Sequence, residues 1–202
     1  MEAGMLRSHV SLWQLPLIAL LIAVSTPLLA ADRYRIDSEH TFSSFEYLHW
    51  GLARQSGRFD KNSGSIQIEA GQNGGAKSGS IDLSIDAASV NTGSDLFDKT
   101  LRSASFFDVA SFPAIRFQSD KLLFEGEQLR QVEGQLSIKG ITRPVTLQIT
   151  HFHCRFMLLY LKQACGANGE ATVKRSDFDL GRYVPFVSDD ITLRFSIEAI
   201  RE

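Results

Sequence analysis

The sequence predicts an all-β protein, an antiparallel sandwich or barrel with one short helix inserted between two strands. Two segments, 80–87 and 190–200, alternate strictly between apolar and polar residues, as a strand does when one of its faces is buried. Shorter segments of similar character recur along the chain, which favours a sandwich or barrel over a mixed fold. With 202 residues, one domain can bury a core without help.

Composition excludes one class of function and leaves another open. The formal net charge is -2 and no segment is dense in Lys and Arg, so the chain lacks the electrostatic pattern of a nucleic-acid-binding protein. All 14 Phe lie after residue 30. Such a content of large apolar side chains suits a filled barrel core and a lipid cavity equally well.

Residues 1–31 have the pattern of a secretory signal peptide. Arg7 and the amino terminus supply a weak positive region, and residues 15–29 form an apolar stretch without charge. Small residues follow and predict cleavage after Ala30 or Ala31.

The alternative for the same segment is an uncleaved membrane anchor. The apolar stretch is shorter than the ~20 residues that a spanning helix needs, and it contains Pro16 and Pro27. A polar strand begins directly afterwards at Asp32. We therefore expect a single exported domain over residues 32–202, which in a bacterium would be periplasmic.

Strands account for most of the first half of this domain. In the segment 41–50, Phe45, Tyr47 and His49 share one face, while the other face is also partly apolar, with Phe42, Ser44 and Leu48. Periodicity alone therefore does not say which face points inward. The strands expected here are 33–37, 41–50, 58–60, 65–69 and 80–87, with a turn region at 51–57, a hinge at 62–64 and a polar loop at 71–79.

One short helix is expected from Ser94, whose hydroxyl can cap the first turn. Phe97 and Leu101 stand four residues apart and give the helix one apolar stripe. Acidic residues in the first turn and basic residues in the last suit the helix dipole; these are Asp95, Asp98, Lys99 and Arg102.

A turn with two adjacent aromatic residues, Phe106 and Phe107, follows the helix. Pro113 then begins a strand, 113–119, in which Ile115 and Phe117 share a face. A short helix that carries aromatic side chains onto a sheet is expected to act as a plug or a lid.

The second half of the domain reads as further strands. Pro144 suits a strand start, where its missing backbone donor costs least. In the last strand Ile191, Leu193, Phe195 and Ile197 point the same way. The strands expected here are 121–125, 130–138, 144–152, 170–174 and 190–200.

The segment 98–117 carries a specific motif, D-x-x-L-R-S-x-x-F-F-D-V-x-x-F-P-x-I-x-F. It closely resembles the central signature of the YceI-like family of secreted lipid-binding proteins. The resemblance extends to Tyr34-Arg35-Ile36-Asp37 with His40, to the segment 134–147, to Arg175-Ser176-Asp177-Phe178 and to the last strand. It implies an extended lipocalin-like barrel of about eight strands, a size that can hold one small ligand.

This resemblance implies binding of a long polyisoprenoid, such as a polyprenyl diphosphate or an isoprenoid quinone, inside the barrel, in a carrier or storage role. Burial of each five-carbon unit gains roughly 3–4 kcal/mol before the costs of ordering and association. We expect a lining of Phe42, Phe45, Leu101, Phe106, Phe107, Phe117, Ile138 and Phe195, with Tyr47, His49 and Arg102 near the head group.

Each of these residues also has a plainer interpretation. The apolar ones suit a filled barrel core, and Arg102 suits a helix-end charge or an ion pair. The chain also departs from the family pattern Arg-x-Asp-Phe-Gly, since Asp179 follows Phe178 and the glycine, Gly181, comes two positions later. We expect the turn there to differ.

Cys154 and Cys165 are the two cysteines of the chain. In an oxidising compartment a disulfide between them is the default, and closing so short a loop stabilises by roughly 2.5–3 kcal/mol. The enclosed segment 155–164 is unusually apolar for a surface connection. It is expected to fold back over a barrel opening, or to rest on a membrane or a partner.

A metal site is the alternative, because His151 and His153 precede Cys154 on one strand. The usual zinc spacings are absent, so we expect neither a metal nor a cofactor. The two histidines share their parity with Val145, Leu147 and Ile149, which would place them where the interior meets water. The simpler expectation is that twist at the strand end turns them into solvent.

Catalytic chemistry is the least favoured of three function classes. No nucleophile elbow, phosphate loop or paired metal-ligand motif is present, and Asp82 and Asp86 lie on the polar face of an alternating strand. The alternative to a lipid carrier is a ligand-free structural or partner-binding module, accompanying a membrane redox protein or a stress response. Contact with a membrane surface or membrane protein, and a homodimer, stay open as partners.

Overall fold

The computed structural model describes residue 1, residues 31–69 and residues 77–202. The expected signal peptide and most of the expected polar loop lie outside these described residues. The described strands are β1 (Asp32–Ile36), β2 (Phe42–His49), β3 (Ala53–Phe59), β4 (Asn62–Glu69), β5 (Ser78–Asp86), β6 (Val90–Asn91), β7 (Ala114–Glu125), β8 (Gln128–Ile138), β9 (Ile141–Met157), β10 (Lys162–Lys174) and β11 (Asp190–Arg201). The helical segments are α1 (Asp95–Arg102) and the 3-10 turns η2 (Ala87–Ser89) and η3 (Arg175–Phe178).

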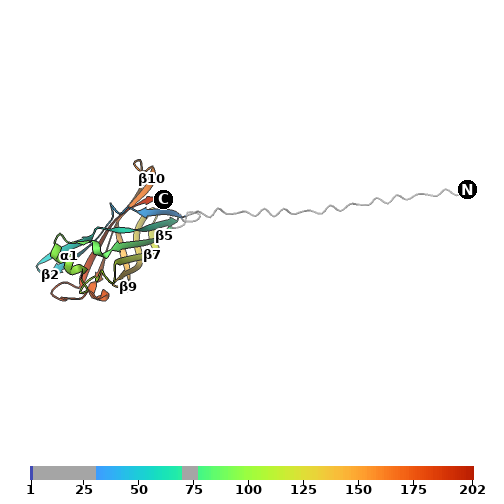
Figure 1. Cartoon of the computed structure of the whole chain (residues 1–202). Coiled ribbons are helices and arrows are strands. Elements are labelled where there is room, and N and C mark those ends of the chain that lie inside the picture. Colours follow the sequence, from blue (N-terminus) through green and yellow to red (C-terminus); the bar gives the residue numbers. More distant parts are fainter. Residues whose placement is uncertain (2–30, 70–76) are drawn as a thin grey trace.

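The strands close into an antiparallel barrel. Its ring runs β1–β4–β5–β7–β8–β9–β10–β11 and returns to β1, which makes eight strands and confirms the expected fold class. Helix α1 and β2 lie at one end of the barrel, and the carboxyl terminus and the start of β10 lie at the other (Figure 1). Among the described residues, no helix has both the length and the hydropathy that a bilayer-spanning segment needs.

The barrel is extended at the α1 end because two long strands are split. Strand β11 pairs with β1 near Ala199 and with β2 between Thr192 and Ser196, so β1 and β2 follow one another along the same edge. Strand β4 pairs with β1 and β3 pairs with β2, so the next row is split at the same level. The wall thus continues past the eight-stranded ring and forms the surroundings of α1.

A buried polar cluster stabilises the point at which these strands divide. The Thr41 hydroxyl donates to the Glu198 carbonyl (3.3 Å) and accepts from the Glu198 N–H (3.1 Å), which replaces a backbone pair. The Asn62 side chain donates to the carbonyls of Thr41 and Phe59, each at 3.0 Å, and accepts from the Ser43 hydroxyl at 2.7 Å. The backbone groups freed by the bend are therefore satisfied, as buried polar groups must be.

The two alternating segments supply the core as predicted. Ile81, Leu83 and Ile85 of β5 are buried, and so are Ile191 and Phe195 of β11. The middle of the barrel is packed with larger side chains. A Cβ on Gly134 would lie 2.6 Å from Cζ of Phe117, so the missing side chain of this glycine makes room for that ring.

Four expectations about strand limits were wrong. The hinge expected at 62–64 is the start of β4, where these residues pair with β5. The segment 51–57, expected as a turn, is largely β3, because its backbone pairs with β2 even though its side chains are exposed. The short strand expected at 170–174 is the end of β10, which begins at Lys162 and pairs on both sides. Its Gly- and Ala-rich part has no alternation to detect. The strands expected at 113–119 and 121–125 are one strand, β7.

Candidate functional site

A cavity of about 240 Å³ lies at the α1 end of the barrel. Its floor consists of core side chains of the barrel, its walls come from β2, β10 and β11, and its cover comes from α1 and the turn after it. The lining is predominantly apolar and includes Phe45, Phe59, Ile85, Phe97, Leu101, Phe106, Phe107, Ile115, Leu136, Ile138, Val173, Phe178, Leu180, Val187, Ile191, Leu193 and Phe195. An apolar ligand can therefore be held here without specific polar contacts to its tail.

The structure brings eight of the eleven expected site residues to this cavity. They come from five separate parts of the chain, and only the fold places them together: Phe45, Tyr47, His49, Leu101, Phe106, Phe107, Ile138 and Phe195. The sequence pattern did not decide which face of β2 points inward. In the structure, the face with Phe45, Tyr47 and His49 does.

The other three expected residues lie elsewhere. Phe117 is fully buried in the core below the cavity, with its ring centroid 6.4 Å from that of Phe195. Phe42 lies on the opposite face of β2, where the Arg58 guanidinium sits 5.0 Å above its ring. Arg102 points from α1 toward the preceding strand and does not line the cavity.

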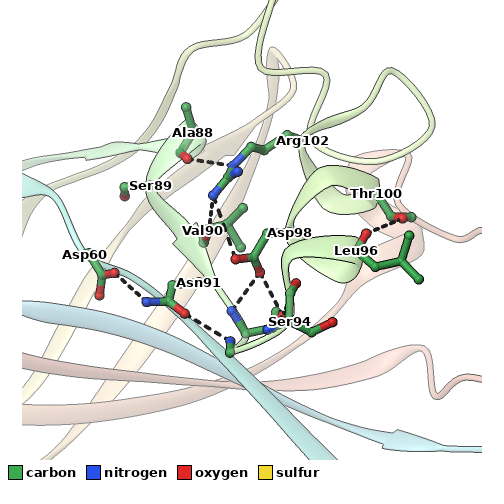
Figure 2. A network of polar contacts seen from close by, with 12 residues as sticks. Asp60, Ala88, Ser89, Val90, Asn91, Ser94, Leu96, Asp98, Thr100 and Arg102 are labelled. Carbon is green, nitrogen blue, oxygen red and sulfur yellow. Dashed lines mark hydrogen bonds and ion pairs between the residues drawn. The ribbon is translucent and has the colours of Figure 1, made fainter.

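Arg102 ties α1 to the chain before it, as Figure 2 shows. Its guanidinium donates to the Ala88 carbonyl at 2.8 Å and to the Val90 carbonyl at 2.7 Å, and it lies 3.9 Å from the Asp98 carboxylate. These contacts agree with its plainer interpretation as a helix-end charge with an ion-pair partner. They fix the end of α1 against η2 and β6.

Asp98 fixes the start of α1 to the segment that precedes the helix. The carboxylate is buried and accepts from both the N–H of Thr92 (2.8 Å) and its hydroxyl (2.7 Å). Ser94 is the N-cap residue, but its side chain makes no capping hydrogen bond, so the expected Ser94 cap was wrong in this respect. The helix start is stabilised instead by Asp98, one turn into the helix (Figure 2).

Aromatic rings follow one another along the cavity wall. The ring centroids of Phe107 and Phe59 lie 5.4 Å apart, those of Phe59 and Phe45 lie 5.8 Å apart, and those of Phe45 and Tyr47 lie 6.3 Å apart. Burial raises the pKa of the Tyr47 hydroxyl, and the positive charge of Arg175 opposes this only partly. The wall is therefore uncharged over its whole aromatic part at neutral pH.

The model of the YceI-like domain matches residues 34–199. The chain belongs to the YceI-like family. Protein YceI of Salmonella arizonae is 30% identical over 174 residues, which cover 85% of this chain and 88% of that protein. A UPF0312 protein of Ectopseudomonas mendocina is also 30% identical, over 176 residues that cover 86% of this chain and 90% of the relative.

Solved structures share the YceI-like barrel. BcnA of Burkholderia cenocepacia superposes with a TM-score of 0.62 at 21% identity, covering 81% of this chain and 98% of BcnA. A domain from Saccharophagus degradans, described as polyisoprenoid binding and implicated in plant cell wall breakdown, superposes with a TM-score of 0.63 at 18% identity. It covers 84% of this chain and 98% of that domain. At these identities the likeness shows the fold.

Arg175 is the main site residue that was not expected from sequence. In this YceI-like barrel its buried guanidinium donates to carbonyls of the following segment, which folds around it: Leu180, Arg182 (2.8 Å), Val187 (3.0 Å) and Ser188 (2.8 Å). Burial lowers the pKa of the guanidinium. Because its donors face backbone oxygens, Arg175 acts as the support of residues 179–189, which we call the mouth loop.

The turn after η3 contains Asp179, the position at which the chain departs from the family pattern. Asp179 adopts φ 57°, the left-handed conformation that a glycine adopts more easily. The Lys139 ammonium donates both to the Asp179 carbonyl (3.1 Å) and to its carboxylate (2.6 Å). An ion pair from the neighbouring turn thus holds the aspartate in this left-handed conformation.

Exposed aromatic side chains border the cavity mouth. The rings of Trp50 and Phe186 stack with centroids 4.8 Å apart, and those of Phe106 and Tyr183 lie 6.4 Å apart. Trp50, Tyr183 and Phe186 are each more than half exposed. Tyr183 and Phe186 lie in the mouth loop, which has no periodicity, and Trp50 lies in the turn after β2, so nothing in the sequence pattern pointed to these residues.

Few polar groups reach the cavity. His49 and Arg182 both line it, at the end of β2 and in the mouth loop. The Arg182 guanidinium lies 5.1 Å over the Tyr183 ring and donates to the Ser105 hydroxyl at 2.8 Å. Arg182 makes no ion pair with a described residue, so its charge is free to meet an anionic group at the mouth.

The cysteines and the neighbouring histidines lie at the far end of the barrel. Cys154 and Cys165 are joined and face one another across β9 and β10, which confirms the expected disulfide. His151 and His153 are exposed, because a bulge between Ile149 and His151 reverses the parity of β9 and turns Phe152 inward instead. The histidines therefore face solvent, as the simpler expectation stated, but a bulge and not twist at the strand end turns them outward.

Proposed function

We propose that this YceI-like protein binds one long polyisoprenoid, a polyprenyl diphosphate or an isoprenoid quinone, as a carrier or store. The observation that carries the proposal is the apolar cavity at the α1 end, whose mouth is bordered by exposed aromatic rings. Lipid binding agrees with the family, and a solved relative from Saccharophagus degradans is described as a polyisoprenoid binding domain. Neither the cavity nor the chemistry of its lining calls for catalysis.

The cavity has room for part of such a tail. Its volume of about 240 Å³ is just below the range of roughly 300–1,000 Å³ for ligand pockets. We infer that the terminal isoprene units, far from the head group, occupy the cavity, while the rest of the tail lies against Trp50, Tyr183 and Phe186 at the mouth. Each buried unit contributes roughly 3–4 kcal/mol before the costs of association, so a few units are enough for stable binding.

We assign the head-group contact to Arg182 and His49. Both line the cavity near its mouth, and Arg182 has no acidic partner among the described residues. Arg102 is a weaker candidate than the sequence suggested, because its guanidinium is engaged by the Ala88 and Val90 carbonyls. An anionic diphosphate would therefore meet Arg182 first.

We further propose that residues 1–31 are a secretory signal, removed after Ala30 or Ala31, and that residues 32–202 function in the periplasm. The charge and hydropathy pattern of the leader supports this. Strand β1 begins at Asp32, directly after the proposed cleavage region. Export also agrees with the disulfide between Cys154 and Cys165.

Mass spectrometry of solvent extracts from protein purified from its native host tests the ligand. We expect an isoprenoid in amounts close to one per chain. A Leu101→Trp variant, which fills the cavity from α1, should lose it, whereas Leu96→Trp on the exposed face of the same helix should retain it. Extracts without isoprenoid, or a Leu101→Trp protein that still carries it, would leave the ligand-free partner module as the better explanation.

A further inference from the structure

The hairpin that joins β9 to β10 presents apolar side chains to solvent at the end of the barrel opposite α1. We call residues 154–165 the tip hairpin. It projects past the barrel wall near the carboxyl terminus (Figure 1). Leu158 and Leu159 are about four-fifths exposed, at 80% and 79%, and Phe156 and Leu161 are also well exposed. A monomer in water gains nothing from such a cluster.

The charge around this apolar tip is positive. The tip hairpin contains Arg155 and Lys162, one on each strand next to the tip, and no acidic residue; neither side chain makes an ion pair with a described residue. The absence of acidic residues extends over the whole segment 134–169. This is unusual for a chain with a net charge of -2.

The acidic side chains of the neighbouring chain ends each have an arginine partner. Asp32 pairs with Arg201, and Glu202 pairs with Arg33 at 3.1 Å. The tip hairpin therefore combines an apolar apex with a positively charged residue on each strand beside it. Such a combination is complementary to a bilayer surface with anionic head groups, where apolar side chains enter the acyl boundary and Lys and Arg meet the phosphates.

The backbone of the turn supports the same conclusion. Leu161 adopts φ 50°, a left-handed conformation that glycine or asparagine adopts with less strain in a hairpin turn. The chain nevertheless carries leucine there, which adds one more apolar side chain to the apex. The disulfide between directly opposed Cys154 and Cys165 fixes the base of the tip hairpin, so the apex is presented by a rigid support.

We propose that the tip hairpin docks this protein on an anionic lipid bilayer. A second copy is a poorer occupant, because two such hairpins would bring four cations together without an anion. The proposal does not depend on the identity of the ligand in the cavity.

Docking at this end has a geometric consequence. Val173 lines the cavity opposite Ile191, and Cys165 lies opposite Ala199, eight residues further along the same strand pair, which is roughly 26 Å of strand. The cavity mouth then points away from the bilayer on which the tip hairpin rests. A protein docked in this way keeps its mouth accessible to a second membrane or to a soluble acceptor.

Co-sedimentation of the disulfide-bonded protein with vesicles tests the proposal. Vesicles of equal parts phosphatidylethanolamine and phosphatidylglycerol should bind it about tenfold or more tightly than phosphatidylcholine vesicles, since each cation near an anionic surface strengthens binding severalfold. Raised salt should weaken the binding. The double change Leu158→Ser with Leu159→Ser should abolish it, and Arg155→Gln with Lys162→Gln should remove the preference for the anionic lipid.

Three controls separate docking from folding. Leu52→Ser makes the same change at an exposed leucine of the opposite end, and Arg116→Gln with Arg143→Gln removes two exposed cations elsewhere; both should bind vesicles like the unchanged protein. Leu161→Gly should raise or preserve the melting temperature, because the strain is released, while it weakens vesicle binding severalfold. A loss of vesicle binding in this variant cannot come from unfolding.

Two kinds of result would overturn the proposal. One is that the unchanged protein does not sediment with the anionic vesicles. This holds also if the protein self-associates, or binds only another protein, through the tip hairpin. The other is vesicle binding that survives Leu158→Ser with Leu159→Ser, or that Leu52→Ser removes, since the docking surface would then lie elsewhere.

Discussion

Trp50 and Phe186 stack at the cavity mouth with ring centroids 4.8 Å apart and an interplanar angle of 27°. The backbone N–H of Trp50 also donates to the backbone carbonyl of Phe186 at 2.8 Å. The pair therefore joins the turn after β2 to the mouth loop, next to the bridge between His49 and Val187, both of which line the cavity. Because both rings remain more than half exposed, this contact can open without disturbing the core.

Phe186→Ala should therefore speed the release of a bound isoprenoid and leave the barrel intact. An aromatic pair of this kind contributes about 0.5–1.5 kcal/mol beyond burial, so we expect the dissociation rate of a fluorescent isoprenoid analogue to rise severalfold. The midpoint of urea unfolding should change little. A dissociation rate equal to that of the unchanged protein would show that the ligand does not pass between these rings.

Asp98→Asn should loosen α1. The Asp98 carboxylate accepts two hydrogen bonds from Thr92 and lies 3.9 Å from Arg102, so an amide in its place loses charge-assisted bonds at a buried position. We expect a loss of about 1–3 kcal/mol in the free energy of unfolding. Asp95→Asn in the exposed first turn of the same helix is the matched control and should cost little. Equal losses in the two variants would contradict the assigned role of Asp98.

Arg175→Lys should destabilise the mouth loop, although it keeps the charge. The planar guanidinium reaches four backbone carbonyls, and the donors of an ammonium at one point cannot reproduce this. We expect about 2–4 kcal/mol less stability in chemical denaturation. Arg143→Lys, at an exposed site, serves as the control. Hydrogen exchange should be faster in residues 179–189 of the Arg175→Lys protein, and unchanged exchange there would refute the support role.

The alternating strands and the helix were predictable because local patterns specify them. Ile81, Leu83 and Ile85 alternate with polar residues, and such a pattern identifies the apolar face of a strand. Segments such as Ala53–Phe59 and the Gly- and Ala-rich start of β10 form strands through pairing with distant partners. Their own side chains carry no sign of it.

The site was predictable only in part, for related reasons. Aromatic composition and the family motif pointed to Phe45, Phe106 and Phe107, which line the cavity. The bulge before His151 reversed the parity of β9, and a bulge leaves no mark in single-sequence periodicity. The contacts of Arg175 depend on a loop with no regular structure, so its role became visible only when its carbonyl partners were located.

The pair of His40 and Asp37 should show a defined pH dependence. His40 Nδ1 lies 2.9 Å from the Asp37 carboxylate. This hydrogen bond and the charge of Asp37 raise the pKa of His40 above its ordinary 6.5. The hydrogen bond from His40 is also the main reason why the pKa of Asp37 lies below its ordinary 3.8.

The sign of the effect follows from these directions. The stabilisation linked to His40 is complete below pH 6.5 and is lost as the pH rises through its raised pKa; that of Asp37 is complete above pH 3.8 and is lost as the pH falls through its lowered pKa. In Asp37→Asn, a nuclear magnetic resonance titration should show the pKa of His40 returning toward 6.5. A His40 pKa that does not move would contradict the pairing.

Gly57→Ala tests whether the cavity itself determines lipid binding. A Cβ at this position would lie 2.5 Å from Cζ of Phe45 and 3.0 Å from Cγ2 of Thr92. The ring of Phe45, which lines the cavity, must then move into the space that the ligand needs. We expect the bound isoprenoid per chain, measured by mass spectrometry, to fall severalfold, with a loss of about 1–3 kcal/mol in stability from overpacking.

Two further variants make this result decisive. Gly166→Ala adds the same methyl group where the nearest described atom is 3.8 Å away, so it should change neither lipid content nor stability by much. Phe45→Leu combined with Gly57→Ala removes the clash and should restore much of the lipid content. If Gly57→Ala keeps its lipid, or if the double variant stays empty while folded, the tail does not occupy the space beside Phe45.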